Sequence, residues 1–150
     1  MHEDRYNQIR IDEDFTVFKF ISEGRHGNLP KIVSFNEIRK NIFNLALGTI
    51  LSNGEIDFET ITNNGDRNKI LATVARIASI FIEHYPGKSV YITGSDNRRT
   101  LLFQRAISYA YDYLEQMFYV YGDISARTPA SEFEPFDTAK NYSGFLIEGK

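Results

Sequence analysis

The sequence contains no cysteine, no tryptophan and only 4 prolines. Without cysteine the chain forms no disulfide, offers no thiolate nucleophile and has no cysteine ligand for a metal. No apolar run approaches the ~20 residues that a membrane-spanning helix needs, and the first residues carry no apolar signal core. We therefore expect a soluble, cytoplasmic protein that has no membrane partner.

Charge of one sign is not in large excess either, with 17 Lys and Arg against 20 Asp and Glu. This balance argues against a basic coat for nucleic acid. The 150 residues, 42% of them hydrophobic and 14% aromatic, predict one domain with an aromatic-rich core. The polar composition of residues 1–12 predicts a flexible N-terminal arm, followed by a single α+β domain over residues 13–150.

Apolar periodicity predicts strands in the first part of that domain. We expect strands over residues 15–21, around residues 32–35, over residues 41–51 and over residues 56–61. In the third of these, Phe43, Leu45 and Leu47 alternate with smaller or polar residues, which is typical of a strand with one buried face. A hairpin turn is expected at residues 52–55.

The second part of the chain alternates helices and strands. Apolar residues spaced i, i+3, i+4 and i+7 predict helices over residues 66–85 and 96–116, with both apolar stripes facing the sheet. Strands are expected at residues 90–92, 118–121 and 142–147, and a long loop at residues 123–140. The order predicts an α+β fold: a mixed, mostly antiparallel sheet packed by two main helices.

Motifs for catalysis and metal binding are incomplete. The 3 histidines have no partner at i+3 or i+4, and the sequence contains no nucleophile elbow or phosphate-binding P-loop. Glu55, Asp57 and Glu59 share one strand face, which we interpret as solvated, with a divalent-ion site as the alternative. We therefore assign no catalytic residue and no metal ligand.

The start of the second helix is the most unusual segment. With Ser95 as the cap and Asp96 in the first position, Arg98 and Arg99 fall in the first turn, where cations are disfavoured. Arg99 also continues the apolar stripe, so we expect it to be substantially buried at the end of the strand at residues 90–93. A carboxylate, backbone carbonyls or a bound anion would hold it.

The start of the first helix has similar ingredients. Gly65 permits a positive φ, and either Asn64 or Asp66 can cap the helix. Together the two helix starts give a candidate site for an anion or cofactor. Its members are Asn64, Gly65, Asp66, Ser95, Asn97, Arg98 and Arg99.

Two motifs resemble those of a family of small uncharacterised bacterial proteins, mainly from Bacteroidetes. The first is Gly94-Ser95-x-x-x-Arg99-Thr100-x-Leu102-Phe103, and the second is Asn141-Tyr142-x-x-Phe145-Leu146 near the end. In that family the position of Phe103 is usually Tyr. The resemblance covers most of the chain and implies no known activity.

The element order is also similar to the later part of the acetyl-coenzyme A-dependent N-acetyltransferase fold. That resemblance implies an N-acetyltransferase-like strand order, with pyrophosphate bound where the first helix begins. Of that loop pattern, residues 63–69 retain only Gly65. Asn97 matches the Asn that the second helix supplies there, and Phe103 has no hydroxyl to act as the general acid. This is a likeness of fold, which does not by itself give function.

We derive two function hypotheses. The first is a non-catalytic module without a cofactor that binds a protein partner or self-associates, with exposed Phe133 and Phe136 in the long loop as its contact residues. The alternative is a degenerate acetyltransferase-like enzyme or coenzyme A binder, with acetyl-coenzyme A as its cofactor.

Overall fold

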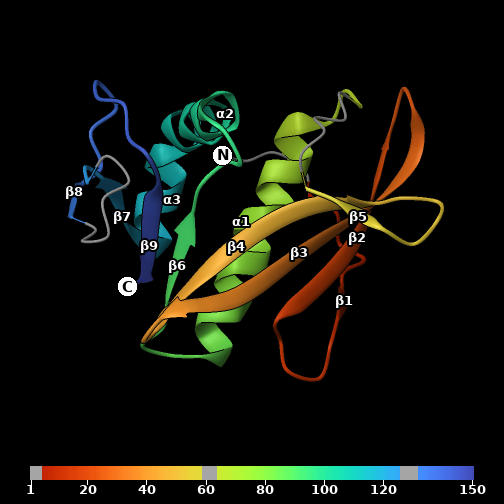
Figure 1. Cartoon of the computed structure of the whole chain (residues 1–150), viewed down its shortest axis with the longest axis horizontal. Coiled ribbons are helices and arrows are strands. Elements are labelled where there is room, and N and C mark those ends of the chain that lie inside the picture. Colours follow the sequence, from red (N-terminus) through yellow and green to blue (C-terminus); the bar gives the residue numbers. More distant parts are fainter. Residues whose placement is uncertain (1–4, 59–63, 126–131) are drawn as a thin grey trace.

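Nine strands and three helices build the described part of the chain, residues 5–58, 64–125 and 132–150 of a computed structural model (Figure 1). In chain order they are β1 (Arg10–Ile11), β2 (Val17–Gly24), β3 (Gly27–Arg39), β4 (Ile42–Ile50), β5 (Ile56–Asp57), α1 (Arg67–His84), β6 (Ser89–Ile92), α2 (Asn97–Tyr109), α3 (Tyr111–Met117), β7 (Phe118–Asp123), β8 (Phe133–Pro135) and β9 (Phe145–Gly149). Among the helices of these residues, none is long and apolar enough to cross a bilayer.

The strands form one sheet in the order β1-β2-β3-β4-β6-β9-β7-β8, with β5 paired to β4. Neighbouring strands run antiparallel except β4 and β6, which are parallel. The predicted α+β class with a mixed, mostly antiparallel sheet is therefore confirmed. Of the fourth expected strand, at residues 56–61, the structure shows β5 over Ile56–Asp57. Residues 59–63 lie outside the described residues.

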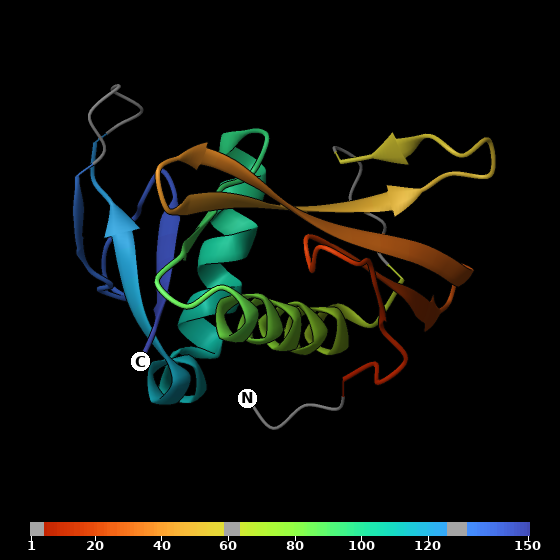
Figure 2. The ribbon, with the colours of Figure 1, turned by 90° about the horizontal axis from the view of Figure 1, so that it is seen from below.

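Helix α1 covers the part of the sheet made by β3 and β4 (Figure 2). Val74, Ile77 and Phe81 lie on its apolar stripe and are buried. The ring of Phe81 stacks on that of Phe35 in β3, with the ring centroids 4.1 Å apart. The predicted helix over residues 66–85 is confirmed to within one residue at each end, and its stripe faces the sheet.

The second predicted helix, residues 96–116, is two helices in the structure. Ala110 ends α2 and precedes α3 with φ −96° and ψ 7°, outside the helical range. The bend brings Tyr111 onto Phe136, with ring centroids 5.5 Å apart. Alanine is the best helix former, so nothing in the local sequence predicts this break; packing against Phe136 accounts for it.

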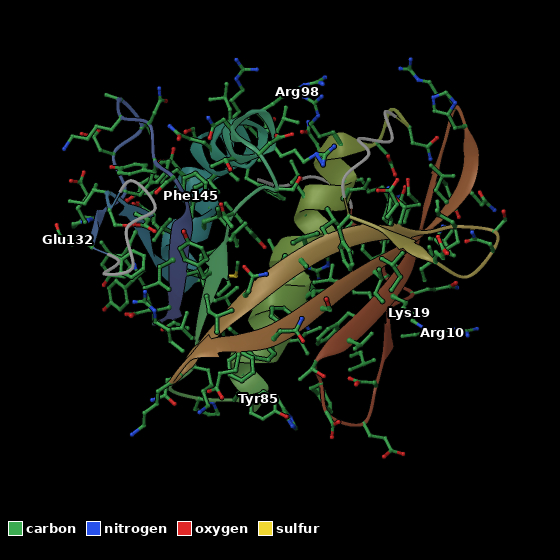
Figure 3. The ribbon with its side chains drawn as sticks, in the orientation of Figure 1. Arg10, Lys19, Tyr85, Arg98, Glu132 and Phe145 are labelled. Atoms are coloured by element: carbon green, nitrogen blue, oxygen red, sulfur yellow. The ribbon has the colours of Figure 1, made fainter. Side chains whose placement is uncertain are left out.

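Residues 5–12, part of the expected flexible arm, pack against the domain. Tyr6 is buried, and its backbone N–H donates to Oγ1 of Thr73 in α1 at 2.9 Å. Strand β1 then pairs with β2 through Arg10 and Lys19, whose side chains project from this edge (Figure 3). The polar composition of this segment did not indicate its packing, because one buried side chain, that of Tyr6, is enough to anchor it.

The expected loop over residues 123–140 also differs from the structure where it is described. It includes strand β8, and Phe136 is only 6% exposed, packed against Tyr142 and Phe145. Phe133 is half-buried. The expectation of an exposed pair of phenylalanines is therefore wrong for Phe136, because aromatic packing beside β9 buries its ring.

Candidate functional site

A cavity of about 410 Å³ lies between the sheet and the starts of α1 and α2. Its apolar walls come from β4 and from both helices, and polar side chains enter from β3, β5 and the two loops that precede the helices. Residues that line it include Lys31, Leu45, Thr49, Asp57, Asn64, Gly65, Asp66, Arg67, Ser95, Arg99 and Phe103.

Lys31 is the buried cation of this cavity. It stands on the helix-facing side of β3, in the same alternating register as buried Val33 and Phe35, and is 5% exposed. Its Nζ donates to Oγ1 of its cross-strand neighbour Thr49 at 2.7 Å. Asp57 pairs with Thr49 on the next strand.

Burial lowers the pKa of Lys31, since removal from water disfavours the ammonium form. The negative charges of Asp66 and Asp57 oppose this shift. The sequence interpretation did not include Lys31. The signal was present, because the alternation of Val33 and Phe35 places a lysine at an inward position of the strand.

Asp66 occupies the N-cap position of α1 but makes no capping bond there. Its Oδ2 instead accepts hydrogen bonds from Oγ of Ser22 at 2.6 Å and from the hydroxyl of Tyr6. Its Oδ1 is buried and has no hydrogen-bond partner among the described residues. Burial, and then the hydrogen bond with Asp66, raise the pKa of Tyr6. Asp66 therefore occupies the expected cap position, but its side chain does not cap the helix.

Asn64 lines the cavity, but its polar atoms fasten the β2–β3 turn. It is 2% exposed, donates from Nδ2 to Oγ of Ser22 and to the carbonyl of Gly27, and accepts at Oδ1 from the backbone N–H of His26 at 2.6 Å. Gly65 has the positive φ, 85°, that its expected role required. The two residues therefore shape the wall where the chain enters α1.

Asp96, rather than Ser95, caps α2. The Asp96 carboxylate accepts from the backbone N–H of Arg99 at 2.9 Å, so the expected cap is one residue too early. Gly94 approaches the helix so closely that a Cβ there would overlap Arg99 and Thr100. A side chain at residue 94 would therefore push this loop off the helix start.

Arg99 lines the cavity and is half-buried, so the expectation that it is substantially buried is wrong. Its Nη1 donates to Oγ of Ser95 at 3.0 Å and to the carbonyl of Phe58 at 3.5 Å. A backbone carbonyl holds the guanidinium, which was one of the expected alternatives. The carbonyl belongs to the segment after β5, however, and not to the end of the strand at residues 90–93. The guanidinium bridges the segment after β5 and the loop before α2.

Five of the seven expected site residues line this one cavity: Asn64, Gly65, Asp66, Ser95 and Arg99. Asn97 and Arg98 are not part of its lining. Both are exposed, and Arg98 projects outward from the start of α2 (Figure 3). One helical position therefore separates Arg99, which faces the cavity, from Arg98, which faces solvent.

The cavity carries three cations, Lys31, Arg67 and Arg99, and two carboxylates, Asp57 and Asp66. The cations therefore exceed the carboxylates by one, and since both carboxylates act on Lys31, the two arginines are the cations left for a ligand. As for the strand carboxylates considered above, Glu55 is exposed and Glu59 lies outside the described residues. No group of three potential metal-binding side chains occurs within residues 5–58, 64–125 and 132–150.

Comparison with known proteins identifies a family for this chain. Searches of curated proteins and of solved structures each find no match. A family model described as a family of unknown function, DUF6934, matches residues 2–150. The expected membership in an uncharacterised family is confirmed at that level, while the bacterial origin and the two motifs stay predictions. The chain belongs to the family of unknown function DUF6934.

Proposed function

We propose that the protein binds a small acidic molecule with an apolar body in the cavity between the sheet and the two helix starts. The observation that carries this proposal is that Arg67 and Arg99 both line an otherwise largely apolar space of about 410 Å³. Small-molecule sites are typically concave and mostly apolar, with a few convergent polar groups, and of this size.

The acidic end of the ligand is expected at the helix starts. Arg67 is the first residue of α1, and Arg99 lies in the first turn of α2. The first N–H groups of α1 donate no hydrogen bond to the Asp66 side chain. Backbone N–H groups and the helix dipole favour an anion at such a position, in addition to the two guanidinium groups.

An acyl-coenzyme A is the specific ligand that we propose to test first. The parallel pairing of β4 with β6 ends at Leu45 and Ile92. Beyond it β4 continues along the cavity, while the chain after β6 turns into α2. This divergence, with α1 starting beside it, supports the N-acetyltransferase resemblance, in which pyrophosphate lies at the first helix. Phe103 lines the cavity and supplies no hydroxyl, so the proposal is binding rather than acetyl transfer.

The protein-binding or self-associating role stays a prediction from sequence. One of its two expected contact residues, Phe136, is buried in the core, and the other, Phe133, is half-buried. The cavity therefore supports the ligand-binding hypothesis better than the described surface supports a partner site.

Thermal unfolding of the full chain with acetyl-coenzyme A tests the proposal. Ligand at 100 times its dissociation constant stabilises a protein by about 2.7 kcal/mol. Pantetheine, which lacks the phosphates, is the matched ligand and should stabilise much less. Octanoate, a small acid with an apolar chain, tests the broader class. No stabilisation by either acid would contradict the proposal.

Arg99→Ala and Arg98→Ala are the matched variants for this experiment. We expect Arg99→Ala to lose most of the acetyl-coenzyme A shift, because its guanidinium faces the cavity. Arg98→Ala should retain the shift, since this side chain projects to solvent. Equal shifts in the two variants would place the ligand elsewhere.

A further inference from the structure

We infer that Lys31 captures a carbonyl compound as a reversible imine inside the cavity. The inference deepens the proposed function and rests on it, since the captured molecule is the ligand of the same cavity. Within the broader class of small acids with an apolar body, and apart from the acyl-coenzyme A thioester, it assigns the captured molecule a reactive group: the carbonyl of an aldehyde or ketone.

The position of Lys31 is the first argument. Its neighbours in the inward register of β3 are apolar, and an apolar side chain at residue 31 would bury its surface without the cost of desolvating an ammonium group. The lysine is nevertheless 95% shielded by the protein and borders the cavity. An amine held at the wall of a largely apolar cavity is the arrangement that imine-forming lysines need.

The protonation state is the second argument. Only the neutral amine attacks a carbonyl carbon, and burial lowers the pKa of Lys31. Among the described residues, four other charged ones border the cavity together with Lys31. They are Asp57 of β5, Asp66 and Arg67 at the start of α1, and Arg99 of α2. The negative charges of the two carboxylates oppose this lowering of the pKa.

The reaction balances with the groups present. The ammonium group of Lys31 first releases a proton to solvent. The nitrogen lone pair then forms the bond to the carbonyl carbon, and the carbonyl oxygen takes up a proton. The resulting carbinolamine takes a second proton on its hydroxyl group and loses water, while the proton on nitrogen that the attack released has returned to solvent. Overall, an ammonium and a carbonyl give a protonated imine and water, with no oxidant or reductant.

The reaction leaves the charge balance of the cavity unchanged. A protonated imine carries the same positive charge as the ammonium it replaces, so it keeps the attraction of Asp57 and Asp66. The buried Oδ1 of Asp66 has no hydrogen-bond partner among the described residues. This carboxylate can therefore accept the proton that the nitrogen releases when the carbinolamine forms, and pass it to solvent.

Reductive trapping tests the inference. The full chain is incubated at neutral pH with 2-oxo-4-phenylbutanoate, which joins a ketone to a carboxylate and an apolar ring. Sodium cyanoborohydride then reduces any imine to a stable secondary amine, and peptide mass spectrometry locates it. We expect the adduct on Lys31 to exceed that on exposed Lys19 of β2, since burial lowers the pKa of Lys31 and so raises its share of neutral amine.

Matched variants keep the test decisive. Lys31→Arg should abolish the adduct, and Lys19→Arg should leave it unchanged. If Lys31→Arg fails to fold, Arg99→Ala takes its place: loss of the acid anchor should lower the yield on Lys31, and an unchanged yield would contradict the assigned ligand class. Equal labelling of Lys31 and Lys19 would overturn the inference. Thermal stabilisation by the same compound without any adduct would overturn imine capture alone and leave the proposed binding in place.

Discussion

The hydroxyl of Tyr6 donates a hydrogen bond to Oδ2 of Asp66, and this bond ties the N-terminal segment to the residue that opens α1. The same hydroxyl accepts from the backbone N–H of Glu23 at 2.9 Å, while Ser22 Oγ donates to the same carboxylate oxygen at 2.6 Å. One wall of the cavity is therefore fixed by three separate parts of the chain, β2, the segment before β1 and the start of α1.

Tyr6→Phe should destabilise the protein by about 1–3 kcal/mol, because it removes a partner from both Asp66 and the Glu23 N–H. Urea unfolding measures this loss. Tyr119→Phe is the matched control: its ring is exposed, and the substitution should change the stability by less than about 0.5 kcal/mol. Equal effects would show that the Tyr6 hydroxyl does not hold the segment.

Asn64→Ala should cost at least about 2 kcal/mol, since it leaves the buried Ser22 hydroxyl and the N–H of His26 without the partner seen here. Asn68→Ala, on the exposed side of α1, should be neutral or slightly stabilising because alanine favours a helix. The two unfolding free energies are compared directly. A cost for Asn64→Ala no larger than that for Asn68→Ala would contradict the structural role of Asn64.

Arg99→Ala should change the stability of the free protein by less than about 1 kcal/mol, because the guanidinium is half-exposed and its partners are a hydroxyl and a carbonyl. A buried arginine paired with a carboxylate would cost about 3–5 kcal/mol instead. Urea unfolding without ligand separates the two. A loss in the larger range would make Arg99 a structural residue.

Lys31→Met should stabilise the protein relative to wild type, and this stabilisation should be larger at neutral pH than at high pH. The folded-state pKa of Lys31 lies below its ordinary value of 10.5, so the unfolded chain binds more protons between those two values. The wild-type free energy of unfolding therefore rises as pH rises through that window. Below the folded-state pKa the full cost of burying the charged ammonium group applies. Unfolding of both proteins at pH 7 and pH 9.5 should show the advantage of Lys31→Met shrinking with pH. An advantage that grows with pH would reverse the assignment.

Local patterns predicted much of this fold. The apolar stripe of α1 located that helix to within a residue because its packing on the sheet follows the sequence period. The break at Ala110 and the docking of Tyr6 could not be predicted, since both depend on residues far away in the chain, Phe136 and Thr73 respectively.

The candidate site was predicted in part for a similar reason. Helix-start chemistry identified Gly65 and Arg99, whose positions follow from local geometry. Lys31 and Asp57 join them only through strand register, which sets their faces but not which helix start covers them. Asn97 and Arg98 were included because a motif does not distinguish adjacent helical positions, although these point in different directions.

An amide NMR titration of the full chain with acetyl-coenzyme A tests the central claim, binding in this cavity, most directly. We predict saturable chemical-shift changes at Gly65, Arg67, Ser95 and Arg99, which line the cavity, and none at Lys140, which lies outside its lining. The same changes should be absent with pantetheine, which lacks the phosphates. Shift changes confined to residues outside the cavity lining, or none at saturating ligand, would contradict the account.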